Sequence, residues 1–475
     1  MHASVWIIIA YLVSILCAIS LIFIERKEAT TTWAWLLILL VLPVVGFVLY
    51  LMFGQNLSRQ KIFKEKKVTD ERKSKELLEK FKEEERNSRM SEEFIELIRM
   101  NYNHSGALYT NGNSIETFIN GEDKFKALIE DIRSAKNFIH IEYYIFRLDE
   151  LGKTIINELK KKVDEGVEVR LLADGMGSKS LRTKDIKYIR SLGIKFYLFF
   201  PGILPYVNTR LNFRNHRKIV VIDGKVGYVG GFNVGDEYIN KGKQFDFWRD
   251  THVRIKGRAV DELNKRFILD WDYASEGELN TYEKYFPKQT EEGDIGIQII
   301  SSGPDHKEEY IKNAYMKIIN DAKKSVYIQT PYLVLDEPMK EALKIAALSG
   351  IDVRIMVPGE PDHFFMAWIL SANMGELMEY GVKIYKYEKG FIHSKTIVAD
   401  GKVASIGTAN LDIRSFQLNF EINAIIFNCD FASKQEKIFN KDIEDSKLVT
   451  LEDYNNRGRA IRIKEALIRL IAPIL

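Results

Sequence analysis

Cysteine is scarce in this sequence, and charge of either sign shows no large excess. Only Cys17 and Cys429 occur among 475 residues, so a disulfide framework is excluded, and no C-x-x-C spacing offers a metal site. Gly- or Pro-rich linkers are also absent, and the formal net charge of +3 is too small to identify a binding partner. With 46% hydrophobic and 28% charged residues, the composition is that of a globular protein of about two or three domains, which excludes wholesale disorder.

Charged residues are missing from two stretches near the N-terminus, residues 5–24 and 33–53. As a helix, each stretch is long enough to cross about 30 Å of hydrocarbon. Lys and Arg cluster just after the second stretch, and none precedes the first. Because basic residues favour the cytoplasmic side, we predict a two-helix transmembrane hairpin over residues 1–54 of a cell-membrane protein, with the rest of the chain in the cytoplasm. A cleaved signal peptide is the alternative for the first stretch.

Two further segments are rich in charge. Residues 55–109 are dense in Lys and Glu with apolar residues at helical spacing, which predicts a charged helical connector; a solvated spacer without function is the alternative. In the C-terminal segment, residues 451–475, basic and apolar residues alternate. This pattern predicts an amphipathic helix over residues 460–471 that lies either on anionic lipid or on the protein core.

The rest of the chain is an internal duplication. Three landmarks recur in the same order: Gly166-Val-Glu-Val-Arg-Leu-Leu matches Gly350-Ile-Asp-Val-Arg-Ile-Met, Gly193-Ile-Lys-Phe-Tyr matches Gly381-Val-Lys-Ile-Tyr, and His216, Lys218 and Asp223 match His393, Lys395 and Asp400. In the first copy, residues 138–145 have the pattern of a strand, 152–165 of a helix and 167–172 of a strand. We therefore predict two similar α/β halves, residues 110–290 and 291–450, packed side by side with the active site at their seam.

Each copy of the third landmark holds an Asp-Gly pair between two apolar runs. A two-residue turn at Asp223-Gly224 would pair residue 222 with 225, 218 with 229 and 216 with 231. His216, Lys218 and Asn233 would then share one face, and Gly231 would leave room there for a ligand. The same turn in the second copy would gather His393, Lys395 and Asn410.

These residue types suit phosphoryl-group chemistry without a metal or another cofactor. A neutral imidazole can attack phosphorus, and a protonated one can protonate the departing oxygen. Lysine ammonium groups and asparagine amides can stabilise the extra negative charge of the transition state. Asp250 and Glu421 stand in apolar stretches where an unpaired carboxylate would be costly, so we expect them to orient the two imidazoles.

The repeated pattern H-x-K-x4-D-x6-G-x2-N is the HKD signature of the phospholipase D superfamily. The stretches NHRKIVVIDGK, GGFNVGDEY, WRDTH and GTANLDIRSFQLNFE, with the two N-terminal apolar stretches, further resemble bacterial cardiolipin synthase. The resemblance implies transfer of a phosphatidyl group between two phosphatidylglycerol molecules, which gives cardiolipin and glycerol through a phosphohistidine. It implies no metal or nucleotide, and it makes phosphatidylglycerol and anionic membrane lipid, not nucleic acid, the expected partners.

The same resemblance assigns roles to the motif residues. His216 is the expected nucleophile and His393 the expected acid and base. Lys218, Lys395, Asn233 and Asn410 are expected to hold the phosphate, with Asp223 and Asp400 as supporting residues at the turns.

Other activities are compatible with the same motifs. A phospholipase D that uses water as acceptor, or a phosphatidyltransferase that uses another headgroup alcohol, would need the same side chains. A nuclease is disfavoured by the two apolar stretches and the modest charge, and a lipid-binding scaffold by the two intact motifs. The sequence leaves open which histidine is the nucleophile, which lipid is the acceptor, the oligomeric state and the regulation.

Overall fold

The computed structural model describes residues 29–42, 63–74, 92–201, 212–279, 282–362 and 364–471, with isolated positions elsewhere in the first fifty residues. Much of both predicted membrane spans falls outside these residues. The described part of this region includes α2 (Ala29–Val41). Among the described residues, no helix combines the length and the apolar character needed to cross a bilayer.

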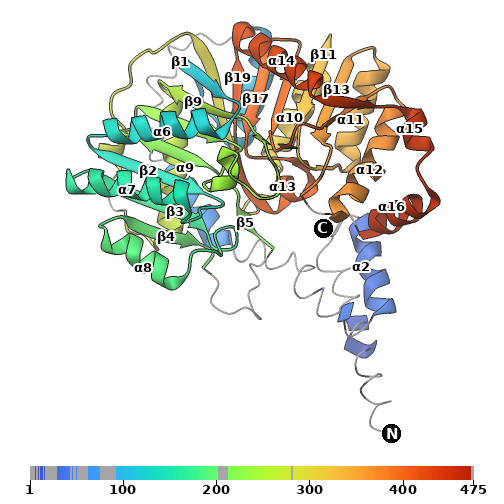
Figure 1. Cartoon of the computed structure of the whole chain (residues 1–475), viewed down its shortest axis with the longest axis horizontal. Helices are drawn as coiled ribbons and strands as arrows, with labels where there is room; N and C mark the ends of the chain where they lie inside the picture. Colours follow the sequence, from blue (N-terminus) through green and yellow to red (C-terminus); the bar gives the residue numbers. More distant parts are fainter. Residues whose placement is uncertain are drawn as a thin grey trace.

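One continuous sheet of sixteen strands runs through the described part of both halves (Figure 1). The first half contributes β1 (Tyr109–Phe118), β2 (Phe138–Tyr143), β3 (Glu168–Asp174), β4 (Lys195–Phe199), β5 (Arg214–Asn215), β6 (Ile219–Ile222), β7 (Val226–Gly230) and β9 (His252–Lys256). The second contributes β10 (Ile295–Ser302), β11 (Ser325–Gln329), β13 (Asp352–Pro358), β14 (Lys383–Tyr387), β16 (Thr396–Ala399), β17 (Val403–Gly407), β19 (Asn419–Phe427) and β20 (Ser446–Val449).

The strand order repeats, which confirms the two similar α/β halves. The first half runs β1-β9-β7-β6-β2-β3-β4, and the second runs β10-β19-β17-β16-β11-β13-β14, with β20 added at its edge. The central strands β1 and β10 pair in antiparallel fashion and join the halves side by side. Each half contains a parallel strand pair, β2–β3 in the first and β11–β13 in the second. These strands consist largely of buried apolar residues, because helices cover both faces of a parallel sheet.

Helices cover the sheet on its faces (Figure 1). The helices described after residue 91 are η3 (Glu92–Phe94), α5 (Ile95–Ser105), α6 (Gly121–Ser134), α7 (Glu150–Asp164), α8 (Thr183–Ser191), η4 (Asp236–Ile239), α9 (Ala259–Ala274), η5 (Glu283–Tyr285), α10 (Tyr310–Asp321), α11 (Glu337–Leu348), α12 (Phe364–Met378), α13 (Ile413–Gln417), α14 (Cys429–Glu444), α15 (Leu451–Asn455) and α16 (Arg459–Ile471). Several begin at a side-chain cap of the expected type; Asp149, for example, accepts from the N–H of Gly152 at the start of α7. The predicted strand, helix and strand of the first half correspond to β2, α7 and β3.

A core shared by both halves lies beneath the centre of the sheet. Phe267 of α9 and Val253 of β9 belong to the same buried cluster as Ile422 of β19 and Phe431 of α14. Because this cluster draws apolar side chains from both halves, separating them would expose it to water.

The hairpin register differs from the predicted one by one residue. Ile222 pairs with Val226 and Ile219 with Val229, so the turn holds three residues, not two. Asp223 and Gly224 both take a positive φ, and Lys225 then donates its N–H to the carbonyl of Ile222. The second copy repeats this turn after Ala399, so the predicted pairing is wrong there in the same way.

Each motif histidine follows a short strand that pairs with a strand of the other half. β5 pairs in parallel with the first residues of β19, and β15 (Phe391–Ile392) pairs in parallel with β8 (Trp248–Arg249). A second small pair, β12 (Leu333–Val334) with β18 (Leu411–Asp412), lies within the second half. His216 directly follows β5 and His393 directly follows β15, so both histidines stand at the seam.

The described parts of the connector and of the C-terminal segment lie against the catalytic halves. Residues 63–74 form a helix whose Phe63 and Lys66 are almost fully buried, so this part of the connector is not a solvated spacer. α16 packs on α12, where Glu465 is buried and accepts a hydrogen bond from Ser371 at 2.5 Å. The C-terminal helix therefore rests on the protein core, while Ile463 remains 61% exposed.

Candidate active site

The side chain of His216, in the first half, contacts a carboxylate of the second half. The backbone N–H of His216 donates to the carbonyl of Phe420 at 2.9 Å, which places the ring beside Glu421. Nδ1 of His216 lies 3.0 Å from both carboxylate oxygens of Glu421, a fully buried side chain. A proton on Nδ1 is held by this carboxylate, so the neutral ring keeps the lone pair of Nε2 available.

The side chain of His393, in the second half, contacts a carboxylate of the first half. The backbone N–H of His393 donates to the carbonyl of Arg249 at 2.7 Å, and its Nδ1 lies 2.7 Å from Oδ2 of the buried Asp250. Nζ of Lys395 also lies 2.9 Å from this Nδ1. The exchange of acids between halves was not visible in the sequence, where Asp250 follows His216 and Glu421 follows His393.

The two motif lysines lie beside the histidines of their own copies. Nζ of Lys218 donates to the carbonyl of His216 at 2.7 Å, and Nζ of Lys395 donates to the carbonyl of His393. Both lysines are buried, so each ammonium group acts in a medium that screens it weakly. Within the described chain, no group of three or more His, Cys, Asp or Glu side chains is placed to hold a metal ion.

Burial is the largest cause of the pKa shifts in this site. It lowers the pKa values of His216 and His393 to about 4 each, and those of Lys218 and Lys395 to about 7 and about 8. The charge of Lys395 further lowers the pKa of His216, and that of Lys218 the pKa of His393, so the two copies act on one another electrostatically. Burial raises the pKa of Glu421, but His216 and Lys218 outweigh it and the pKa is lowered overall. At neutral pH both rings are therefore neutral.

Asp223 and Asp400 lie away from the imidazoles. The carboxylate of Asp223 accepts three backbone N–H bonds of 2.7–2.9 Å from residues 136–138, and that of Asp400 accepts three of 2.7–2.9 Å from residues 323–325. The extended chain from Lys218 to Asp223 spans roughly 16 Å. These carboxylates fix the starts of β2 and β11 to the hairpin turns and do not contact the histidines.

The motif asparagines and Gly231 differ in their surroundings. Oδ1 of Asn233 accepts from the N–H of Ile145 at 3.1 Å and its Nδ2 donates to Tyr238 at 3.2 Å, so this amide is engaged within its own half. Asn410 is buried, and its side-chain oxygen has no hydrogen-bond partner within the described chain. The expectation that Gly231 leaves room for a ligand is wrong, because the Asp250 carboxylate fills that space. A Cβ added at Gly231 would lie 1.9 Å from this carboxylate.

Two buried arginines that the sequence interpretation did not single out support the acids. Arg217 donates to the carbonyl of Glu421 at 3.1 Å and pairs with Asp270 at 2.6 Å. Arg249 pairs with Asp442 at 2.6 Å and donates to the carbonyl of Asp250 at 2.7 Å. Arg217 adjoins His216 and Arg249 adjoins Asp250, but a neighbouring position in the sequence does not show whether an arginine is buried or exposed.

Aromatic rings flank both histidines. The ring of Tyr144 meets His216 edge-on with centroids 4.8 Å apart, and the ring of Trp248 lies 5.4 Å from His393. These contacts restrict the orientation of each imidazole in addition to its hydrogen bond to a carboxylate.

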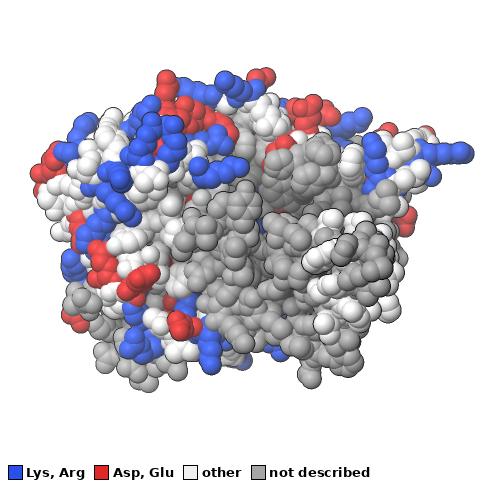
Figure 2. All heavy atoms as spheres, turned by 90° about the horizontal axis from the view of Figure 1, so that it is seen from below, with Lys and Arg blue, Asp and Glu red and all other residues white. Residues whose placement is uncertain are grey.

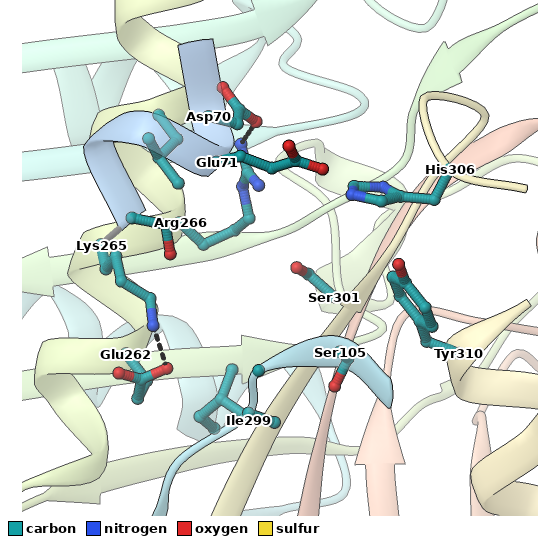
Figure 3. Close-up of a pocket in the computed structure, with 14 residues that line it drawn as sticks. Asp70, Glu71, Ser105, Glu262, Lys265, Arg266, Ile299, Ser301, His306 and Tyr310 are labelled. Carbon is teal, nitrogen blue, oxygen red and sulfur yellow. Dashed lines mark hydrogen bonds and ion pairs between the residues drawn. The ribbon is translucent and has the colours of Figure 1, made fainter. Parts of the chain in front are cut away.

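A separate cavity of about 240 Å³ lies between helix 63–74, α9 and the chain that leads to α10 (Figure 3). Arg266, His306 and Tyr310 are among its lining residues, and none of the motif residues is. Arg266 pairs with Asp70 and Asp270 at 2.8 Å each, and Asp270 pairs in turn with Arg217. The cavity therefore borders the ion pairs that support Glu421, not the imidazoles.

Two repeated α/β halves, each with an H-x-K histidine held by an acid of the other, define a phospholipase D-like protein. The family model described as Cardiolipin synthase, PLD-like domain, matches residues 128–271 and 315–443, and the model described as Phospholipase_D-nuclease N-terminal matches residues 5–55. The chain belongs to the cardiolipin synthase family of phospholipase D-like proteins.

Individual relatives agree with this assignment along nearly the whole chain. A cardiolipin synthase of Clostridium perfringens is 50% identical over 457 residues, which cover 95% of this chain and 96% of the relative. The major cardiolipin synthase of Bacillus subtilis is 47% identical over 479 residues, covering 100% and 99%. The solved structure of a phosphatidylserine synthase from Haemophilus influenzae shares the fold, with a TM-score of 0.58 at 16% identity over 76% of this chain and 93% of that chain.

Proposed function

We propose that this protein is a cardiolipin synthase, which transfers the phosphatidyl group of one phosphatidylglycerol to the glycerol headgroup of another. The observation that carries the proposal is the exchanged pairing of His216 with Glu421 and of His393 with Asp250. It brings the reactive groups of both copies to one seam, where the lysines add positive charge. The names of the relatives support the choice of this phosphatidyltransferase over others on the same fold.

In the first half-reaction, Nε2 of His216 attacks the phosphorus of the donor lipid. The bond between phosphorus and the glycerol oxygen breaks, and protonated His393 gives its proton to that oxygen, so free glycerol leaves. His393 is neutral at neutral pH before the donor lipid binds, and the phosphate anion of the donor favours its protonated form. The lysines stabilise the additional charge on the phosphorus oxygens.

In the second half-reaction, neutral His393 removes the proton from a headgroup hydroxyl of the acceptor lipid. The hydroxyl oxygen attacks the phosphohistidine, the bond between phosphorus and Nε2 of His216 breaks, and cardiolipin leaves. The assignment of His216 as nucleophile is supported by its contact with both oxygens of Glu421, while Nδ1 of His393 is shared between Asp250 and Lys395.

Membrane attachment through a hairpin of residues 1–54, with the catalytic halves in the cytoplasm, completes the proposal. α2 extends from the side of the catalytic halves where β5, α13 and α16 also lie (Figure 1). On the face seen from that side, Lys and Arg side chains are interspersed with Asp and Glu among the described residues, and Lys and Arg also lie at the end occupied by α15 and α16 (Figure 2). The basic side chains at that end suit anionic lipid headgroups. Membranes washed with alkaline carbonate should retain the protein, and its release would disprove the hairpin.

The activity test uses the purified full-length protein with phosphatidylglycerol in detergent micelles and separates the products by thin-layer chromatography. Cardiolipin and glycerol are expected from the native chain, while His216→Ala and His393→Ala should each lose at least about 1,000-fold in rate. A His104→Ala variant, altered at a ring that contacts Tyr310 instead, is the matched control. Phosphatidic acid without cardiolipin would indicate a hydrolase, and cardiolipin formation by either active-site variant would refute the two-histidine mechanism.

A further inference from the structure

The proposed reaction, on which this inference rests, brings two phosphates together. The donor phosphate is the reacting group between the imidazoles. The acceptor carries its own phosphodiester, which is joined to the attacking hydroxyl through the three carbons of one glycerol. A site that selects phosphatidylglycerol as acceptor therefore needs a second group of cations close to the first, because a buried phosphate requires compensating charge.

Most cations around the imidazoles are already committed. Lys218 and Lys395 lie beside the histidines themselves and serve the reacting phosphate. Arg217 and Arg249 are buried in ion pairs of 2.6 Å with aspartates, so binding a phosphate would require breaking those pairs.

Arg214 and Arg414 lie one side chain beyond His216 and come from different halves. Arg214 precedes His216 on β5 and shares a side-chain hydrogen bond with Tyr144, whose ring meets His216 at 4.8 Å. Arg414, on α13, donates to the side-chain oxygen of Asn212 at 3.0 Å and to its backbone carbonyl at 2.8 Å. Asn212 stands two residues before Arg214, so β5 and the residues before it hold both arginines together.

The charge of this arginine pair favours an anion. The acceptors that Asn212 contributes to Arg414 are neutral. Burial and the neighbouring charge of Arg214 lower the pKa of Arg414, and together they outweigh the charge of Asp412, which raises it. Two like charges held together at a partly buried position repel one another, and a bound phosphate relieves the repulsion. Planar guanidinium groups also match the oxygens of a phosphate in pairs.

We propose that Arg214 and Arg414 bind the phosphate of the acceptor lipid and so select an anionic phospholipid as the attacking alcohol. Tyr144 separates this second phosphate from His216 and the reacting phosphorus. A small neutral alcohol or water reaches the phosphohistidine without using the arginine pair, so the pair distinguishes lipid transfer from transfer to such acceptors.

The test compares two reactions of the same full-length protein in detergent micelles. Cardiolipin formation from phosphatidylglycerol requires a lipid acceptor, whereas incorporation of labelled glycerol into phosphatidylglycerol uses a neutral one. For Arg214→Gln and Arg414→Gln, we expect cardiolipin formation at low phosphatidylglycerol to fall roughly ten- to hundredfold. Glycerol incorporation should fall by less than about threefold, since it does not need the second phosphate site. Arg414→Lys keeps the charge without the planar fork and should lie between Arg414→Gln and the native chain.

Arg182→Gln is the matched control, because its side chain, just before α8 of the first half, is 70% exposed. Parallel loss of both reactions in the two glutamine variants, or no loss in either, would overturn the acceptor site and leave the proposed function standing. A native chain that incorporates glycerol but forms no cardiolipin would overturn the proposed function, and the acceptor site with it.

Discussion

The aspartate of each motif accepts backbone N–H groups at a turn, while a different carboxylate meets each imidazole. Asp223 binds residues 136–138 and Asp400 binds residues 323–325, whereas Glu421 and Asp250 lie 3.0 and 2.7 Å from the rings. A motif residue can therefore be required for the shape of a strand end and not for proton transfer.

Replacement of either motif aspartate by alanine is expected to lower stability more than intrinsic activity. Each variant leaves three backbone N–H groups without their acceptor, which should lower the free energy of unfolding by roughly 1–3 kcal/mol. At a temperature where the variants remain folded, kcat should stay within about threefold of native, against losses of 100-fold or more for removal of a catalytic group. Thermal denaturation and cardiolipin assays check this, with the exposed Asp164→Ala as control. Loss of activity in a fully folded Asp223→Ala protein would contradict it.

Because both active-site lysines are buried, kcat/KM should fall with rising pH at a lower pH than for ordinary lysines. The pKa values of about 7 for Lys218 and about 8 for Lys395 mean that both lose their charge as pH rises through those values. Since both lysines must be charged to hold a phosphate, kcat/KM for glycerol incorporation should fall as pH rises from about 7, not near the ordinary lysine pKa of about 10.4. His216, with a pKa of about 4, stays neutral above pH 5 and causes no loss there.

The check is a pH–rate profile in neutral detergent micelles, where no anionic surface shifts the local pH. Lys395→Arg keeps its charge throughout this range, so the part of the fall caused by Lys395 should move to higher pH in that variant. A native profile that stays flat to pH 9.5 would show that the lysines are not the titrating groups.

At the scale of the elements, helix 63–74 packs behind the strand that carries Glu421. Phe63 packs against Phe213 and Phe420 with ring centroids 5.1 and 5.4 Å away, and Phe420 directly precedes Glu421. Lys66 pairs with Asp270 at 3.4 Å, and Asp270 also pairs with Arg217. Part of the segment that follows the predicted membrane hairpin therefore packs behind Glu421, the carboxylate that orients His216.

Phe63→Ala should therefore destabilise the protein by about 3–5 kcal/mol, since it leaves a cavity among packed rings. It should also lower kcat, because the strand that carries Glu421 loses its packing on this side. The exposed Val68→Ala, at 59% exposure on the same helix, is the matched control and should change neither. The measurements are urea denaturation and cardiolipin assays, and a Phe63→Ala protein of native stability would show that the helix is only loosely docked.

The short strands β5 and β15 explain why the acids are exchanged. Each pairs with a segment of the other half that ends one residue before an acid, as the bonds from His216 to Phe420 and from His393 to Arg249 show. Parallel pairing at these two positions fixes both imidazoles beside carboxylates from the opposite half.

At the scale of the whole molecule, a single chain supplies the complete site. The continuous sheet through β1 and β10 and the core shared by α9 and α14 hold the halves in one arrangement. Neither half has both an imidazole and its acid, so each half alone lacks the reactive pair.

Mixing purified His216→Ala with His393→Ala protein should consequently restore no activity. Each variant chain retains one reactive imidazole, and exchange of halves between chains would require breaking the shared sheet and core. Cardiolipin assays of the mixture, compared with each variant alone, check this. Recovery of more than a few per cent of native activity would mean that halves of different chains form the site together.

The sequence by itself determined the duplication, the α/β class and the reactive residue types, because periodicity and repeated motifs depend only on the order of residues. The membrane hairpin stays a prediction. The sequence also placed Asp250 and Glu421 among the acids of the site. Only the tertiary structure decided which acid meets which histidine, since this pairing depends on strands more than 140 residues apart in the chain. The three-residue turn, the buried face of helix 63–74 and the pairing of Arg214 with Arg414 are likewise products of packing, where contacts between distant segments outweigh local preference.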